Sequence, residues 1–179
     1  MDELFLLPSA PVAMPRAYWG DDHHALSSAM LLVEPSHFEF SRIIDAIKHR
    51  ENDDFDMEIV NHLYGDSCLV LPHRNYLLLT GDFRRKKHVR YLGSDLEKWN
   101  ATAEYEKTKF IHFSDWPLPK PWITPEYYQR IQVEPRCSPS VEDDCSGAKI
   151  WFKLYEDFKL RRLDVCGEAL NRPVGHGFG

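Results

Sequence analysis

A continuous apolar run that ends in proline and leads straight into an amphipathic helix pattern is the feature that most constrains the fold of this chain. The run is LSSAMLLVEP, residues 26–35, and it predicts a buried strand in a sheet that is covered on both faces. Ser36 and Glu39 follow with the spacing of a capping box. Behind them four apolar side chains share one helical face: Phe40, Ile43, Ile44 and Ile47. Residues 25–50 therefore predict strand, tight turn and helix, which is half of a βαβ unit.

Strand and helix patterns continue to alternate beyond this unit. FDMEIVNHLYGD, residues 55–66, predicts a second helix with Asp56 as its N-cap and Gly65 in a left-handed conformation at its end. SCLVLP predicts a short strand, and KFIHF, residues 109–113, predicts another. This alternation predicts an α/β fold with a mixed sheet flanked by helices.

The C-terminal third predicts two further helices. One begins with Thr124 as N-cap and Pro125 as the first helical residue. The other covers residues 149–167, where Gly167 ends it. At 179 residues the chain has the length of one domain, which we assign to residues 1–167, and we expect residues 168–179 to form a disordered tail.

The charge balance argues against a nucleic-acid partner. The net charge is −6, whereas nucleic-acid-binding domains carry a basic footprint. The one basic run, RRKKHVR at residues 84–90, is either a solvated loop or an anion site. The chain has no apolar run long enough to cross a membrane, and its acidic N-terminus differs from a signal peptide.

Two of the four cysteines have a spacing that suggests a pair. Cys137 and Cys145 flank a loop rich in serine, proline and acidic residues, and they could close a disulfide in an oxidising compartment. Free thiols are an equally good interpretation. The spacing of cysteines and histidines does not match a structural zinc site.

His112 and Lys120 are the residues best placed to bind a ligand. His112 lies at the end of a predicted strand, where α/β proteins place ligand groups, although a buried core histidine fits the pattern equally well. Lys120 stands between Pro119 and Pro121. Both prolines restrict the backbone of this region, so the lysine charge is preorganised for a phosphate.

Four segments, in order, resemble the second half of the glycogenin-like glycosyltransferases of family eight. They are LSSAMLLVEPS, FDMEIVN, LVLPHRNYLLL and FIHFSDWPLPKPW. They are similar to the family patterns F-N-S-G-V-x-V-x-x-P-S, D-Q-G-x-x-N, L-P-x-x-Y-N and H-F-x-G-x-x-K-P-W. PRAYW and the helix at 149–167 look closest to a fungal branch that is taken to add N-acetylglucosamine to mannose-containing glycans. The resemblance covers about residues 1–167.

This resemblance implies a GT-A fold, a UDP-sugar donor, a glycan acceptor, a Mn²⁺ cofactor and transfer with retention at the anomeric carbon. His112 matches the histidine that ligates the metal together with the DxD carboxylates, and Lys120 matches the lysine that contacts the donor diphosphate. Asp56 matches an aspartate near the transferred sugar, which makes it the candidate catalytic residue. Ser27 and Ser28 match the pair that lines the donor pocket. A metal and a fixed ammonium both stabilise the charge of a leaving diphosphate, and imidazole suits Mn²⁺ alongside carboxylates.

The chain departs from the family pattern at several positions. Met57 and Glu58 replace the glutamine and glycine of D-Q-G, and Ala29 replaces a glycine beside Ser27, which itself replaces asparagine. Asp115 replaces the glycine of H-F-x-G, in a loop with two extra residues. These changes weaken any transfer of glycogenin-like sugar contacts to this chain.

The opening MDELF resembles the residues that directly follow the DxD of the family. We therefore expect an incomplete GT-A-type fold, an N-terminally truncated enzyme with little or no activity alone, and poor binding of Mn²⁺ by His112 without the carboxylates. A non-catalytic binding module that retains the acceptor-side half is the alternative. The family implies the Golgi or secretory pathway, whereas this chain by itself, with no visible signal or anchor, would be cytoplasmic.

Overall fold

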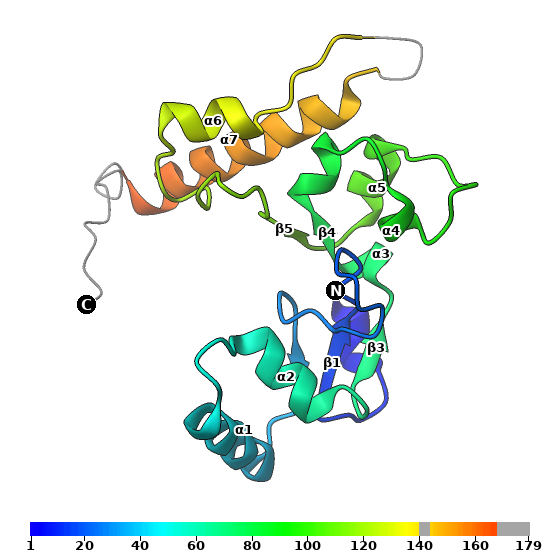
Figure 1. Ribbon diagram of the computed structural model, residues 1–179, viewed down its shortest axis with the longest axis vertical. Helices are drawn as coiled ribbons and strands as arrows, with labels where there is room; N and C mark the ends of the chain where they lie inside the picture. Colours follow the sequence, from blue (N-terminus) through cyan, green and yellow to red (C-terminus); the bar gives the residue numbers. More distant parts are fainter. Residues whose placement is uncertain (140–143, 168–179) are drawn as a thin grey trace. The chain divides into compact units, whose positions relative to one another are not determined.

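The computed structural model describes residues 1–139 and 144–167 and divides into two compact units (Figure 1). The first unit comprises residues 1–78, 89–96 and 107–110, and the second comprises residues 79–88, 97–106 and 111 onward. Helices combine with a small mixed sheet, so the predicted mixed α/β class is confirmed. The predicted tail, residues 168–179, lies outside the described residues.

The first unit is built on a three-stranded sheet with β1 (Val12–Pro15) at its centre. β1 runs antiparallel to β2 (Leu32–Val33) and parallel to β3 (Leu69–Leu71). Successive side chains of a strand point to opposite faces, and both faces of β1 pack against apolar clusters. One cluster comprises Leu4, Ala13, Met30 and Leu71, and the other comprises Val12, Met14, Leu26 and Tyr64. The sequence analysis did not predict β1, although it holds the core of this unit.

Helices and one 3₁₀ turn complete the first unit: η1 (Asp2–Leu6), α1 (His37–His49), α2 (Asp56–Tyr64), α3 (His73–Tyr76) and α4 (Val89–Leu92). α1 begins as predicted, because the Ser36 hydroxyl accepts a hydrogen bond from the Glu39 amide at 3.4 Å. Its predicted apolar face is only partly covered, since Phe40 remains 64% exposed.

α2 lies in the predicted segment and ends at Gly65 as predicted, but the predicted N-cap residue and the predicted left-handed conformation of Gly65 are wrong. The helix begins at Asp56 and its N-cap is Phe55, whose amide donates to the Glu58 carboxylate at 3.0 Å. Glu58 is the third residue of the helix, and its carboxylate reaches back to the amide of the N-cap residue, as in one half of a capping box. Gly65 has a φ of −51°, in the right-handed region, because its amide still donates to the carbonyl of Asn61 at 2.9 Å.

The predicted strand over 26–35 is also wrong for most of its length, because only Leu32 and Val33 are in a strand. Leu26 forms an isolated antiparallel bridge with Arg16. Its own backbone groups bind the side chain of Asn61, whose oxygen accepts from the Leu26 amide and whose nitrogen donates to the Leu26 carbonyl, both at 2.7 Å. The Ser27 hydroxyl then accepts from the Ala29 amide at 3.2 Å. Such local side-chain bonds compete with sheet pairing and turn the backbone.

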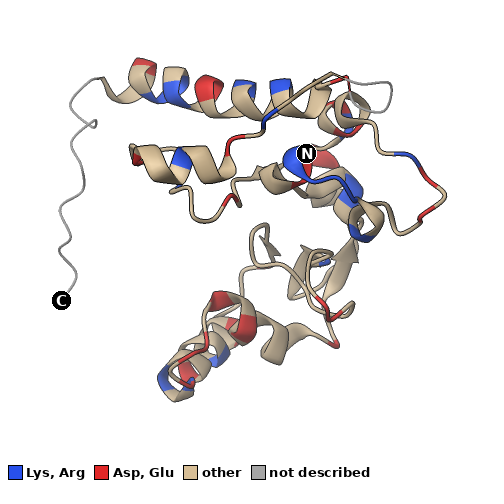
Figure 2. Ribbon diagram, turned by 45° about the horizontal axis from the view of Figure 1, so that its top comes forward, with Lys and Arg blue, Asp and Glu red and all other residues tan. Residues whose placement is uncertain are grey.

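The second unit contains η2 (Thr80–Arg84), α5 (Ala101–Lys107), β5 (Ile111–His112), α6 (Tyr127–Val133) and α7 (Ser146–Cys166). β5 pairs with β4 (Leu78–Leu79) in a two-stranded sheet. α7 buries Ile150 and Trp151, and Figure 2 shows both basic and acidic positions along it. Its end at Gly167, where φ is 66°, is confirmed.

The close packing of α7 against η2 depends on a glycine in the first turn of α7. A Cβ atom at Gly147 would come within 2.5 Å of the carbonyl oxygen of Phe83. A side chain at this position would therefore push α7 away from η2. Gly147 lets the two elements approach until their backbones nearly touch.

Two further expectations concern the segment between Lys120 and α7. α6 begins at Tyr127 with Glu126 as its N-cap, so the predicted start at Thr124 and Pro125 is wrong. The two interpretations of Cys137 and Cys145 are resolved in favour of a disulfide, with their Cα atoms 5.6 Å apart. Among the helices in residues 1–139 and 144–167, none combines the length and apolar character needed to cross a membrane.

Replacing Asn61 with alanine tests the contact between α2 and residue 26. Asn61→Ala should lower the free energy of unfolding by about 1–3 kcal/mol, because a buried amide and a buried carbonyl lose their partners. Denaturant unfolding measures the loss, and hydrogen exchange at the Leu26 amide localises it. Asn52→Ala, at an exposed asparagine, is the control. Equal stability of the two variants would contradict the role given to Asn61.

Candidate functional site

His112 and Lys120, predicted separately from the sequence, lie in direct contact in the second unit. His112 is the last residue of β5 and is half-buried. The Lys120 Nζ atom is 3.2 Å from the His112 Nε2 atom and also donates to the carbonyl oxygen of Phe113. A charged ammonium group has only donors, so its contact with a neutral imidazole assigns Nε2 as the acceptor and the proton to Nδ1.

The surroundings of this pair shift both of its pKa values downward. Burial, and then the charge of Lys120, lower the pKa of His112 below its ordinary value. Burial also lowers the pKa of Lys120, while the nearby Asp115 carboxylate acts in the opposite direction. The arrangement therefore favours a neutral imidazole beside a lysine that is held in place, with its charge partly shielded from water.

The loop between these two residues is anchored by Asp115, which the sequence analysis noted only as a departure from the family pattern. Its side chain is completely buried. The carboxylate accepts hydrogen bonds from four side chains: Thr80 at 2.5 Å, Arg84 at 2.6 Å, Trp151 at 2.9 Å and Tyr155 at 3.0 Å. A buried carboxylate is tolerated only with this kind of pairing.

Aromatic contacts join the same loop to α7. The ring of Phe113 packs edge-on against Tyr155 and Phe158, with centroids 4.9 and 5.5 Å apart. Beyond Lys120, the ring of Trp122 lies 6.1 Å from that of Phe158, and its carbonyl accepts a hydrogen bond from Arg162 at 2.7 Å. α7 therefore supports the backbone on both sides of Lys120.

The other predicted site residues belong to the first unit. Ser27 is buried at 1% exposure, and its amide donates to the carbonyl of Pro15 at the end of β1, at 2.8 Å. Ser28 is half-buried, and Asp56 is an exposed carboxylate in the first turn of α2. Their predicted roles, donor binding for the serines and catalysis for Asp56, stay predictions.

The described residues do not fit a metal site by themselves. Among residues 1–139 and 144–167 there is no group of three histidine, cysteine or carboxylate side chains that could hold a metal ion. His112 offers one nitrogen, and a lysine ammonium lies 3.2 Å from it, where its charge opposes a cation. The Mn²⁺ cofactor stays a prediction that rests on the family resemblance.

The arginines of the basic run at 84–90 are paired with carboxylates of the chain. Arg84 contacts Asp115, and Arg85 lies 3.4 Å from Asp82. Arg90 contacts Asp21 at 2.5 Å in the first unit. These pairs neutralise much of the run and leave exposed Lys86 and Lys87 between them, as expected of a solvated loop.

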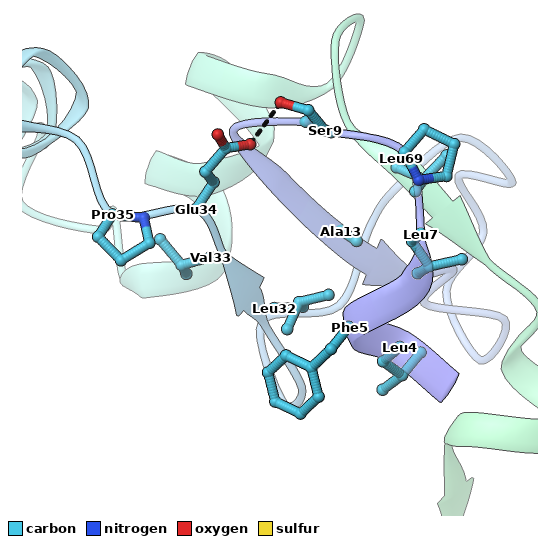
Figure 3. Close-up of a pocket in the computed structure, with 12 residues that line it drawn as sticks. Leu4, Phe5, Leu7, Ser9, Ala13, Leu32, Val33, Glu34, Pro35 and Leu69 are labelled. Atoms are coloured by element: carbon cyan, nitrogen blue, oxygen red, sulfur yellow. Dashed lines mark hydrogen bonds between the residues drawn. The ribbon is translucent and has the colours of Figure 1, made fainter. Parts of the chain in front are cut away.

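A separate apolar pocket of about 390 Å³ lies in the first unit (Figure 3). Figure 3 shows Leu4, Phe5 and Leu32 facing it, with Ala13 on β1 behind them. At one edge the Ser9 hydroxyl donates to the Glu34 carboxylate at 2.6 Å. The pocket contains none of the predicted site residues.

Comparison with known proteins gives one consistent name. The chain is 48% identical over 93% of its length to glucose N-acetyltransferase 1 of Gibberella zeae, and 43% identical over 93% to the protein of that name from Aspergillus fumigatus. A Candida albicans protein of the same name is 26% identical over 88% of the chain. The chain spans 37%, 47% and 43% of these three relatives. No protein-family model matches it.

Removing the lysine charge should raise the pKa of His112. In the variant Lys120→Met the second cause of the shift is gone, while burial still holds the pKa below about 6.5, the ordinary value. An NMR titration of His112 measures the change. Lys153→Met, at a lysine paired with Asp157 in α7, is the control and should leave His112 unaffected.

The same shift predicts how stability depends on pH. The folded pKa of His112 lies below its unfolded value, so the unfolded chain binds more protons between the two. The stabilising contribution is fully present above pH of about 6.5 and is lost as the pH falls through the folded pKa. The loss should be smaller in Lys120→Met. A wild-type His112 that titrates at or above its ordinary value would refute this account.

Proposed function

We propose that this chain is part of an N-acetylglucosaminyltransferase, which takes the sugar from a UDP-linked donor and transfers it to a glycan acceptor with retention at the anomeric carbon. The observation that carries this proposal is the 48% identity, over 93% of the chain, to a protein named glucose N-acetyltransferase 1. The chain spans 37% of that relative. We therefore assign the reaction to a protein that includes this segment.

Lys120 would act on the leaving group of this reaction. The bond between the anomeric carbon and the diphosphate oxygen breaks, and its electron pair stays on that oxygen. The acceptor hydroxyl oxygen bonds to the carbon, and its proton passes to the leaving diphosphate oxygen. An ammonium beside the leaving oxygen stabilises the developing negative charge. Lys120 is already held by its flanking prolines and by the Phe113 carbonyl, so little ordering remains to be done on binding.

The residues of the first unit would contribute on the side of the donor sugar. We assign Ser27 and Ser28 to the donor pocket, where the contact between Asn61 and Leu26 fixes the backbone in front of them. Asp56 presents an exposed carboxylate that can accept hydrogen bonds from sugar hydroxyls. We assign it to the transferred sugar.

A segment exchange tests the proposal. The matching segment of the Gibberella zeae relative is replaced by this chain, and the chimera is assayed with UDP-N-acetylglucosamine labelled in the sugar and a mannose-containing glycan. We expect transfer of the labelled sugar. Acetyl-coenzyme A, labelled in the acetyl group, is the second donor and should give no labelled glycan. The 179-residue chain alone is expected to transfer little or no sugar.

Two substitutions in the chimera assign the roles. His112→Ala and Lys120→Met should each lower the transfer rate by about 100-fold, the usual loss for one electrostatic group of this kind, while Lys153→Met should not change it. If the chimera folds but transfers no sugar while the unmodified relative is active, the enzyme hypothesis is contradicted and the alternative, a non-catalytic binding module, is supported.

A further inference from the structure

The buried Asp115 carboxylate is not explained by the proposed chemistry. It is 3% exposed and contacts neither His112 nor Lys120 by a hydrogen bond among those described. We propose that Asp115 is a positioning residue, which fixes the loop from Phe113 to Lys120 and thereby sets the Lys120 ammonium against the His112 imidazole. What the pair then binds rests on the proposed function, whereas the positioning itself does not.

The four donors to Asp115 come from two separate elements. Thr80 and Arg84 belong to η2, and Trp151 and Tyr155 belong to α7. Three of the bonds converge on Oδ2 and the Arg84 Nε atom bonds to Oδ1. Only a carboxylate offers enough acceptor sites for four donors. Asp115 therefore joins η2, α7 and the loop at a single point.

Two further hydrogen bonds extend the constraint that Asp115 places on the loop, one towards β5 and one towards Lys120. Towards β5, the Ser114 amide donates to the Thr80 hydroxyl at 3.0 Å, and Thr80 in turn donates to Asp115. Towards Lys120, the Leu118 amide donates to the Asp115 carbonyl at 2.6 Å. A turn thus closes two residues before Lys120 and fixes the direction in which the chain reaches it.

The Tyr155 side chain connects Asp115 to the lysine by a second route. Its hydroxyl donates to the carboxylate, and its ring packs against Phe113. Phe113 supplies the carbonyl that accepts from Lys120 Nζ. The carboxylate, the tyrosine and the phenylalanine therefore hold the acceptor that orients the ammonium. Loss of the carboxylate should release the lysine from His112 even where the fold survives.

A role in folding alone makes a different prediction from positioning. If Asp115 only stabilised the second unit, a folded Asp115 variant would keep the contact between His112 and Lys120, as would any other variant with an equal loss of stability. If Asp115 positions the loop, its removal should change which nitrogen of His112 carries the proton. The Nδ1–H form is set by the Lys120 contact at Nε2, and an imidazole without that contact reverts to a mixture in which Nε2–H predominates.

The experiment reads the ¹⁵N and ¹³C signals of the His112 ring in the 179-residue chain, at a pH where the imidazole is neutral. Asp115→Asn keeps the size and removes the charge, so the amide group faces Arg84. Val12→Ala, at a buried position of the first unit, is the destabilised control, and denaturant unfolding measures the stability of both variants. We expect the Nδ1–H signature in the wild type and the control, and the Nε2–H mixture in Asp115→Asn. A folded Asp115→Asn with the wild-type signature would overturn the proposal.

A second variant tests the positioning role of Asp115 if Asp115→Asn does not fold. Tyr155→Phe keeps the ring against Phe113 and removes one hydrogen bond to Asp115, so it should give a smaller change of the same sign. An unchanged His112 signature there would also overturn the proposal.

Inorganic pyrophosphate, titrated into the same samples, separates this inference from the proposed function. Asp115→Asn should weaken its binding about tenfold relative to the control, the equivalent of one charge-assisted hydrogen bond. If the wild type does not bind pyrophosphate but the His112 signature still responds to Asp115→Asn, the positioning role stands. The diphosphate role of Lys120 is then decided by the same titration of the chimera, and absence of binding there would contradict that role.

Discussion

The fully buried carboxylate of Asp115 is the interaction on which the arrangement of the second unit depends. Its four donors lie 31 to 40 residues away in sequence on η2 and α7. A buried charge is costly unless every lone pair is used, so these elements must assemble together. That shared requirement makes the loop before Lys120 a defined structure. Lys120 and His112 are in contact because hydrogen bonds to Asp115 restrict the conformation of the loop between them.

The first unit is organised by apolar packing. β1 is buried on both faces, by Met30 and Leu71 on one side and by Leu26 and Tyr64 on the other. The side chain of Asn61 then connects α2 to the turn that carries Ser27. Ser27, one of the residues proposed to line the donor pocket, therefore directly follows a residue of the hydrophobic core, Leu26. The first unit is held together by burial of apolar surface, and the second by the pairing of a buried charge. Each unit thereby positions residues that belong to the family motifs.

Sequence reasoning succeeded where the deciding contacts are local. The Ser36 cap and the end of α7 at Gly167 follow from interactions within a few residues. It failed where a distant partner decides. Residues 26–31 have the apolar character of a strand, but pairing there is limited to an isolated bridge between Leu26 and Arg16, and Asn61, 35 residues away, binds both backbone groups of Leu26. The cap at Asp56 was misplaced by one residue for a local reason, because Phe55 is the N-cap and its amide donates to Glu58.

For the candidate site, the sequence by itself determined that Lys120 lies in a restricted, proline-flanked backbone and that His112 ends a strand, because both properties are written in neighbouring residues. It also carried the family motifs that suggest a role for each. Only the tertiary structure decided that the two side chains touch, that burial and the lysine charge lower the pKa of His112, and that the Asp115 carboxylate meets donors from two distant elements. Those outcomes depend on the packing of η2 and α7 around one carboxylate. The neighbouring residues of Asp115 do not indicate which distant side chains will donate hydrogen bonds to it.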